Sequence, residues 1–142
     1  MTMVGSANTY SLVQQSDTNA YLIRYGSTSI MQINPSTGTV KDYIDLSSYT
    51  FTGAEFPRMV DAKIVENKLF VALQRLGASW SKEQAYVAVI DLATNQEIDT
   101  NPQQDGFKGI PLTGTNPYSL QANNGNIYVA SRGDYDHTTG AL

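Results

Sequence analysis

The sequence predicts an all-β protein built from repeated antiparallel units of four strands. Tyr, Val, Ile and Thr are abundant, and these residue types favour strands over helices. Apolar residues make up 41% of the 142 residues and charged residues 15%, which is typical of a globular chain. Helical periodicity is almost absent, and only residues 81–84 are expected to form one helical turn.

One repeated segment is a turn residue followed by an apolar strand. Residues 19–23 match residues 67–71, and both match residues 125–129. The copies are 48 and 58 residues apart, which is close to the spacing of β-propeller blades with loop insertions. The chain therefore contains an internal repeat.

A second repeated piece is a turn between two strands. Asn34 and Asp91 can each accept a backbone hydrogen bond two residues further on, which forms an Asx-turn. Gly38 and Asn95 close the two turns, and both residue types tolerate a positive φ.

The first strand of each unit also repeats. Residues 10–12, Tyr-Ser-Leu, recur without change at 118–120, and Pro117 has a counterpart in Pro57. A proline at the first residue of a strand costs no ladder hydrogen bond. The matches predict one domain, residues 1–142, with units at about 9–46, 57–100 and 116–142, the last incomplete. Strands are expected at 10–15, 20–25, 29–34 and 40–46, at 59–66, 68–74, 85–91 and 96–100, and at 118–122 and 126–131.

The second strand of the middle unit is apolar on both alternating sets of positions, 69–71–73 and 70–72. A half-exposed strand would alternate apolar with polar residues, so this strand is expected to be covered on both faces. Blades of a β-propeller pack in this way. We therefore predict a partial β-propeller of antiparallel four-stranded blades, with a small β-sandwich as the alternative.

Residues 67–74, 86–91 and 109–117 resemble the YncE-like bacterial propeller proteins, which are related to NHL-like and quinoprotein-like repeats. The resemblance implies an exported protein of the periplasm or cell surface, often a lipoprotein, that serves as a binding scaffold. It carries over no catalytic residues. The first residues of this chain have no signal-peptide pattern.

Two complete units and half of a third would leave open edges, because a closed propeller needs at least four blades. Three solutions are open: a fragment of a longer protein, a ring assembled from several copies, or a small sandwich. We expect a fragment, because the third unit ends where its third strand should begin.

Charge and composition exclude several classes of function. The net charge is −4 and the nine basic residues are scattered, so a nucleic-acid partner is not expected. No apolar run is long enough to span a membrane. Cysteine is absent, which excludes disulfides and thiolate ligands.

The long links between strands are expected to emerge on one face of the units. They are residues 47–58, 75–84 and 101–116, and long loops in compact domains often carry function. We predict that this long-loop face binds a protein or a small molecule. Its candidate contacts are Gln74, Arg75, Trp80 and Arg132, of which the two arginines could face an anionic ligand.

Metal binding is the weaker interpretation of two acidic loops. Asp134 and Asp136 lie just before His137, the only histidine, but Asx-turn chemistry explains that loop without a ligand. Asp99, Asn101 and Asp105 also offer oxygen ligands, although calcium needs about six to eight. Calcium on either loop, and a lactonase- or quinoprotein-like propeller enzyme with a metal-assisted site, remain the alternatives. No catalytic residues are predicted.

Overall fold

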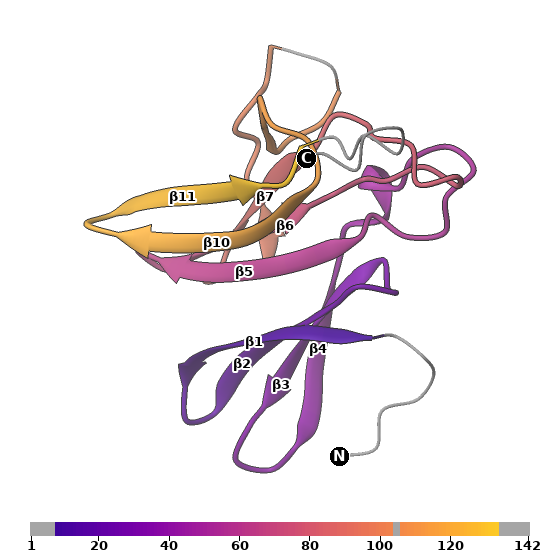
Figure 1. Cartoon of the computed structure of the whole chain (residues 1–142). Coiled ribbons are helices and arrows are strands. Elements are labelled where there is room, and N and C mark those ends of the chain that lie inside the picture. The colour runs from indigo at the N-terminus through magenta and orange to yellow at the C-terminus, as the bar shows by residue number, and fades with distance from the viewer. Residues whose placement is uncertain (1–7, 104–105, 134–142) are drawn as a thin grey trace.

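The computed structural model describes residues 8–103 and 106–133, and over these ranges the protein is all-β with antiparallel pairing, which confirms the expected fold class. Three sheets follow one another along the chain (Figure 1). The first unit contains β1 (Thr9–Ser16), β2 (Asn19–Arg24), β3 (Ser29–Asn34) and β4 (Thr39–Asp45). The second contains β5 (Met59–Val65), β6 (Lys68–Leu73), β7 (Tyr86–Asp91) and β8 (Gln96–Glu97), and the third contains β10 (Pro117–Asn123) and β11 (Asn126–Ser131).

Two local predictions differ from the structure, and two short elements were not predicted. Residues 81–84 are not helical, because the backbone closes a tight loop in which Gly77 N donates to Ser81 O (2.9 Å). A short 3-10 helix, η1 (Ser47–Tyr49), lies in the preceding long link instead. Strand β8 is shorter than expected, and a short strand that was not predicted, β9 (Ile110–Pro111), pairs with β7 at Tyr86 and Val87.

The hairpin turns correct the alignment of the repeats by one residue. Strand β2 begins at Asn19, whereas β6 begins at Lys68 and β11 at Asn126, so Asn19 is equivalent to these and not to Asn67 and Gly125. The sequence match failed because the turns differ. Glu66–Asn67 and Asn124–Gly125 have positive φ at both positions, as in a type I′ turn, and the turn of the first unit does not.

The corrected alignment makes the aromatic residues Tyr21, Phe70 and Tyr128 equivalent in the three units. It also preserves the predicted match of the first strands. Tyr10, Val60 and Tyr118 each occupy a register irregularity at the start of the unit.

Each sheet has two faces, because side chains alternate along a strand. We call face A the one that carries Leu12 and Leu22 in the first unit, Ala62 and Val71 in the second, and Leu120 and Val129 in the third. Face B is the opposite one, which carries Tyr21, Phe70 and Tyr128. These two names are used for all three units.

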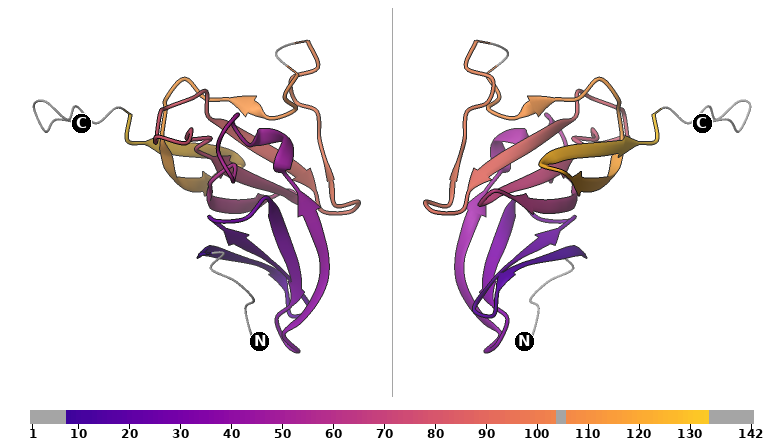
Figure 2. Two further views of the ribbon diagram at one scale, coloured as in Figure 1. Left: turned by 90° about the vertical axis from the view of Figure 1, so that its right-hand side faces the viewer. Right: turned by 90° about the vertical axis from the view of Figure 1, so that its left-hand side faces the viewer.

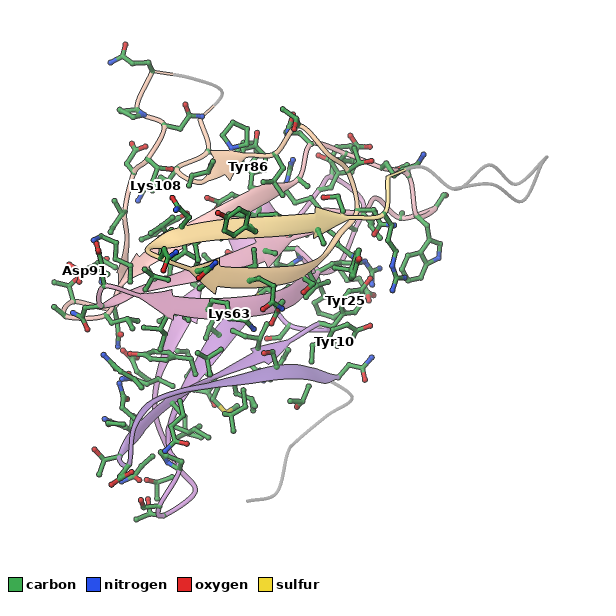
Figure 3. All side chains as sticks on the ribbon, turned by 60° about the vertical axis from the view of Figure 1, so that its left-hand side comes forward. Tyr10, Tyr25, Lys63, Tyr86, Asp91 and Lys108 are labelled. Carbon is green, nitrogen blue, oxygen red and sulfur yellow. The ribbon has the colours of Figure 1, made fainter. Side chains whose placement is uncertain are left out.

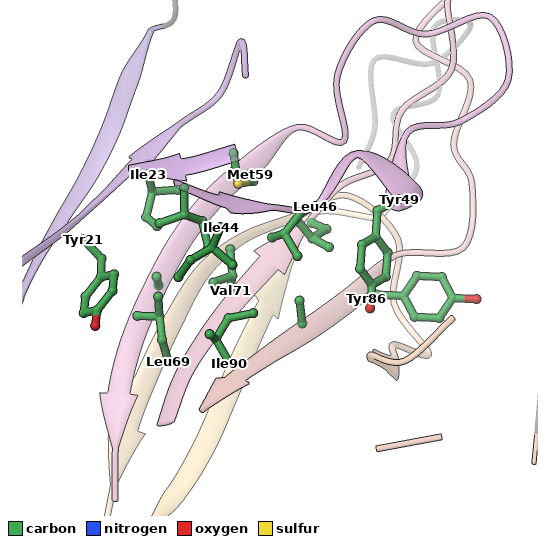
Figure 4. Packing of buried hydrophobic residues seen from close by; sticks show 14 residues of the cluster. Tyr21, Ile23, Ile44, Leu46, Tyr49, Met59, Leu69, Val71, Tyr86 and Ile90 are labelled. Atoms are coloured by element: carbon green, nitrogen blue, oxygen red, sulfur yellow. The ribbon is translucent and has the colours of Figure 1, made fainter. Parts of the chain in front are cut away.

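The units stack in a head-to-tail order. Face B of the first unit packs on face A of the second through a core that includes Tyr21, Ile23 and Ile44 on one side and Leu69, Val71 and Ile90 on the other (Figure 4). Face B of the second unit then packs on face A of the third, where Val60, Ala72 and Val87 meet Leu120. Strand β5 therefore lies between β1 and β10 (Figure 1).

This order is compatible with both expected architectures, a partial propeller and a small sandwich. Here unlike faces meet at both interfaces, and the layers follow one another in the same sense (Figure 2). No helix in the described ranges has the length and apolar character needed to cross a membrane.

Candidate functional site

The long links meet at one end of the units, and Arg75 joins them. Its Nε donates to the carbonyl of Tyr49 (2.9 Å) in the first link, and its Nη1 donates to the carbonyl of Gln84 (2.7 Å) in the second. Its guanidinium also lies 4.4 Å from the ring centroid of Phe107, in the third link. Arg75 is buried, so it holds the loop end together from inside.

Gln74 makes a similar connection between units. The hydroxyl of Tyr25 donates to its Oε1 (2.9 Å), and its Nε2 donates to Asn116 Oδ1 (2.8 Å) and to the carbonyl of Pro117 (3.0 Å). These partners belong to the first and third units or their entrances. Gln74 and Arg75, both predicted as ligand contacts, thus have their polar atoms directed at other parts of the chain.

Trp80 takes part in an exposed stack that we call the aromatic ladder, formed by Tyr10, Tyr25, Arg58 and Trp80. The Tyr10 and Tyr25 rings are stacked with centroids 4.8 Å apart, and these two residues lie next to each other in Figure 3. The Arg58 guanidinium lies 5.2 Å from the Tyr25 centroid and 4.4 Å from that of Trp80. The two ends of the ladder face solvent, because Tyr10 is 55% and Trp80 61% exposed.

Four separate segments supply the ladder. Tyr10 comes from the start of β1, Tyr25 follows β2, Arg58 precedes β5, and Trp80 lies in the link between β6 and β7. In an antiparallel sheet, the start of one strand lies beside the end of its neighbour. Residues that precede or begin one strand and residues that follow the next therefore reach the same end of the units. The sequence reasoning identified Trp80 alone, because no local pattern connects the other three residues to it.

Three residues with large side chains adopt a left-handed backbone conformation at this end. Arg58 (φ 60°), Arg75 (φ 51°) and Trp80 (φ 60°) adopt left-handed conformations, which are uncommon for side chains of this size. Such conformations persist where the surrounding contacts impose them, and they cluster at binding sites. Here the ring and carbonyl contacts of the arginines impose them.

Arg58 carries the polar function of the ladder. Its Nε is buried and has no hydrogen-bond partner within the described part of the chain. No described carboxylate forms an ion pair with it either. Burial raises the pKa of Tyr25, and the positive charge of Arg58 opposes that rise in part. The ladder therefore combines apolar ring surfaces with a cationic donor.

Arg132 occupies a related place in the third unit. It follows β11 as Tyr25 follows β2, and its guanidinium lies 5.0 Å from the ring centroid of Tyr118, the equivalent of Tyr10. Its side chain is exposed. A ring stacked on a neighbour thus recurs at the loop end of the third unit.

A separate polar groove runs along the outer rim between β4 and β8. It has a volume of about 550 Å³, and its lining includes Asp42, Asp45, Glu97, Phe107 and Lys108. Glu97 accepts a short hydrogen bond from the hydroxyl of Tyr49. Burial raises the pKa of Glu97, although that hydrogen bond and the charge of Lys108 lower it in part. Burial and the neighbouring Glu97 also raise the pKa of Tyr49.

The predicted acidic loops give little structural support for a metal site. Asp99 Oδ1 accepts from the backbone N–H of Asn101 (3.0 Å), which is the Asx-turn chemistry expected from the sequence. Asp105, Asp134, Asp136 and His137 lie outside the described residues. Over residues 8–103 and 106–133, no group of three His, Asp or Glu side chains is placed to hold a metal ion.

Comparison with known proteins assigns no family. No protein-family model matches the chain, and no curated protein sequence matches it. The fold and the site therefore rest on the geometry described above.

Proposed function

We propose that the chain is a non-enzymatic binding module and that the aromatic ladder is its contact surface. The observation that carries the proposal is the Arg58 guanidinium stacked on Tyr25 and Trp80, with a buried Nε that lacks a described partner. Exposed aromatic residues and arginine are enriched where proteins bind partners. The strained backbone at Arg58 and Trp80 supports the same assignment.

The chemistry of the ladder indicates the class of ligand. Tyr10 and Trp80 offer flat apolar surfaces, which suit a sugar ring or a ring-bearing side chain of a peptide. Arg58 adds a donor that suits a carboxylate or another acceptor. We propose a small-molecule or protein ligand that presents a ring and an acidic group side by side. By its resemblance to exported propellers, we place the protein outside the cytoplasm.

The intrinsic fluorescence of the protein tests this proposal directly, because Trp80 is the only tryptophan in the chain. The probes are oligosaccharides that contain a uronic acid, short peptides that contain Tyr and Glu, and neutral versions of both. We expect acidic ring-bearing probes to change Trp80 emission in a saturable way and neutral versions to bind at least about tenfold more weakly.

Two variants identify the ladder as the cause. Arg58→Gln and Tyr10→Ser should abolish the saturable change while leaving the circular dichroism spectrum intact. Tyr128→Ser is the matched control, because Tyr128 is exposed to a similar extent (57%) but lies away from the ladder. Saturable binding that survives Arg58→Gln, or no response to any probe, contradicts the proposal.

A further inference from the structure

Two sheet faces have no described strand packed on them: face A of the first unit and face B of the third (Figure 2). Of the exposed large apolar side chains in the described ranges, most lie on these two faces. They are Leu12, Val40 and Tyr43 on face A of the first unit and Tyr118 and Tyr128 on face B of the third.

Comparison of the three units shows what face A contacts in the second and third units. Leu12 is 54% exposed, but its equivalent in the third unit, Leu120, is fully buried against face B of the second unit. Next to Leu12, the apolar residues Leu22 and Met31 on β2 and β3 are already buried (5% and 8% exposed), so the open part of this face consists of Leu12, Val40 and Tyr43. This surface has the composition of the faces that pack inside the molecule.

Face B of the third unit likewise exposes a residue whose equivalents pack on a neighbouring unit. Its Tyr128 is largely exposed, whereas the equivalent Tyr21 is fully buried against the second unit. Phe70, the equivalent residue in the second unit, packs on the third. The aromatic position therefore points at the next unit wherever a next unit is present.

The polar groups on the two faces also match. Arg24 lies on face A of the first unit, where its guanidinium is buried and donates to the carbonyl and the hydroxyl of Ser29 (both 3.1 Å). Its Nε has no partner among the described residues. Ser119 and Gln121 on face B of the third unit carry acceptor oxygens beside Tyr128.

We propose that copies of this chain associate head to tail, with face B of the third unit of one copy on face A of the first unit of the next. The contact continues the A-on-B order that the chain already uses twice internally. It is a heterologous interface, since each copy contributes a different surface at each end. The third unit supplies only two described strands, so the contact is smaller than a standard interface of about 1,600 Å² and association is weak.

Sedimentation velocity and light scattering of the 142-residue chain test the proposal. We expect the average mass to rise above 15.5 kDa with increasing concentration. Leu12→Arg removes the apolar surface of one face and Tyr128→Arg that of the other, and each should hold the mass at that of a monomer. Ile110→Arg is the matched control, because Ile110 is an exposed strand residue on neither face, and it should associate as the wild type does.

Mixing the two variants separates a head-to-tail contact from a symmetric one. Each variant keeps one intact face, so an equimolar mixture should form a heterodimer of twice the monomer mass and grow no further. A folded wild-type chain that stays monomeric at its highest soluble concentration overturns the proposal. That result is expected if both faces are covered by further units of a longer polypeptide. A mixture that stays monomeric while the wild type associates overturns the head-to-tail geometry.

Discussion

The guanidinium of Arg75 lies over the Phe107 ring at 4.4 Å while its Nε donates to the carbonyl of Tyr49 at 2.9 Å. One buried side chain thus connects residues that are 26 and 32 positions away in the sequence, on two different links. This connection fixes the arrangement of the long links at their end of the molecule. It therefore also fixes the position of the neighbouring aromatic ladder.

Replacement of Arg75 by Met should lower the free energy of unfolding by about 3 kcal/mol, because the carbonyls of Tyr49 and Gln84 lose a charged donor and the ring contacts disappear. Urea denaturation measures the change. Arg132→Met, at an exposed arginine, is the control and should cost less than about 0.5 kcal/mol. Equal effects of the two substitutions would contradict the role given to Arg75.

Gln74→Leu should destabilise the protein by about 2 kcal/mol, since the Tyr25 hydroxyl and the Pro117 carbonyl would lose their partner. The substitution conserves volume, so little of the loss can come from packing. Gln14→Leu serves for comparison, because Gln14 is exposed and bonds only to the nearby Ser16 carbonyl. A stability change at Gln74 no larger than at Gln14 would show that the bridge between units is unimportant.

Asp61 connects all three units and was not identified from the sequence. Its Oδ1 accepts from Ser11 Oγ (3.2 Å), and its Oδ2 accepts from the backbone N–H of Leu120 (2.9 Å). Asp61→Ala should therefore cost about 2 kcal/mol and Asp61→Asn less, because the amide keeps one acceptor. Thermal unfolding of both variants, beside the exposed Asp17→Ala, measures the order. An Asn variant as unstable as the Ala variant would contradict it.

Glu97 predicts a specific dependence of stability on pH. Burial raises its pKa in the folded state, so the folded protein holds this proton at pH values where the unfolded chain has lost it. The free energy of unfolding should then fall as pH rises from the ordinary glutamate pKa through the raised one. Glu97→Gln removes this component, so the variant should gain stability over the wild type across that window.

Urea midpoints of wild type and Glu97→Gln at several pH values measure the effect. The exposed Glu55→Gln provides the baseline for loss of one carboxylate. If the difference between Glu97→Gln and wild type is constant from acid to neutral pH, the burial of a neutral Glu97 carboxyl is refuted.

The repeat could be predicted because its signals are local. Both expected Asx-turns are present, because the backbone N–H of Ser36 donates to Asn34 Oδ1 (3.0 Å) and that of Ala93 donates to Asp91 Oδ1 (2.9 Å). The one-residue error at Asn19 arose where the turns of the repeat differ in conformation. Strand β9 was not predicted because it pairs with β7 over only two residues, which is too short for a periodic sequence pattern.

The site was harder to predict than the fold. Gln74 and Arg75 were predicted from their position after a strand, and Trp80 as an aromatic residue in a long link; the structure turns the first two inward and leaves Trp80 exposed. The companions of Trp80 come from three other segments, and their contacts depend on which strand ends are neighbours. That information appears only once the sheets are assembled.

The head-to-tail stacking also distributes stability unevenly along the chain. Only the second unit has a described neighbour on each face, so opening β6 or β7 must break two apolar interfaces at once. The first and third units each have one such interface. Amide hydrogens should therefore exchange with solvent slowest at Leu69–Leu73 in the centre and progressively faster toward β1 and β11, and binding on either outer face would flatten that gradient from its own side.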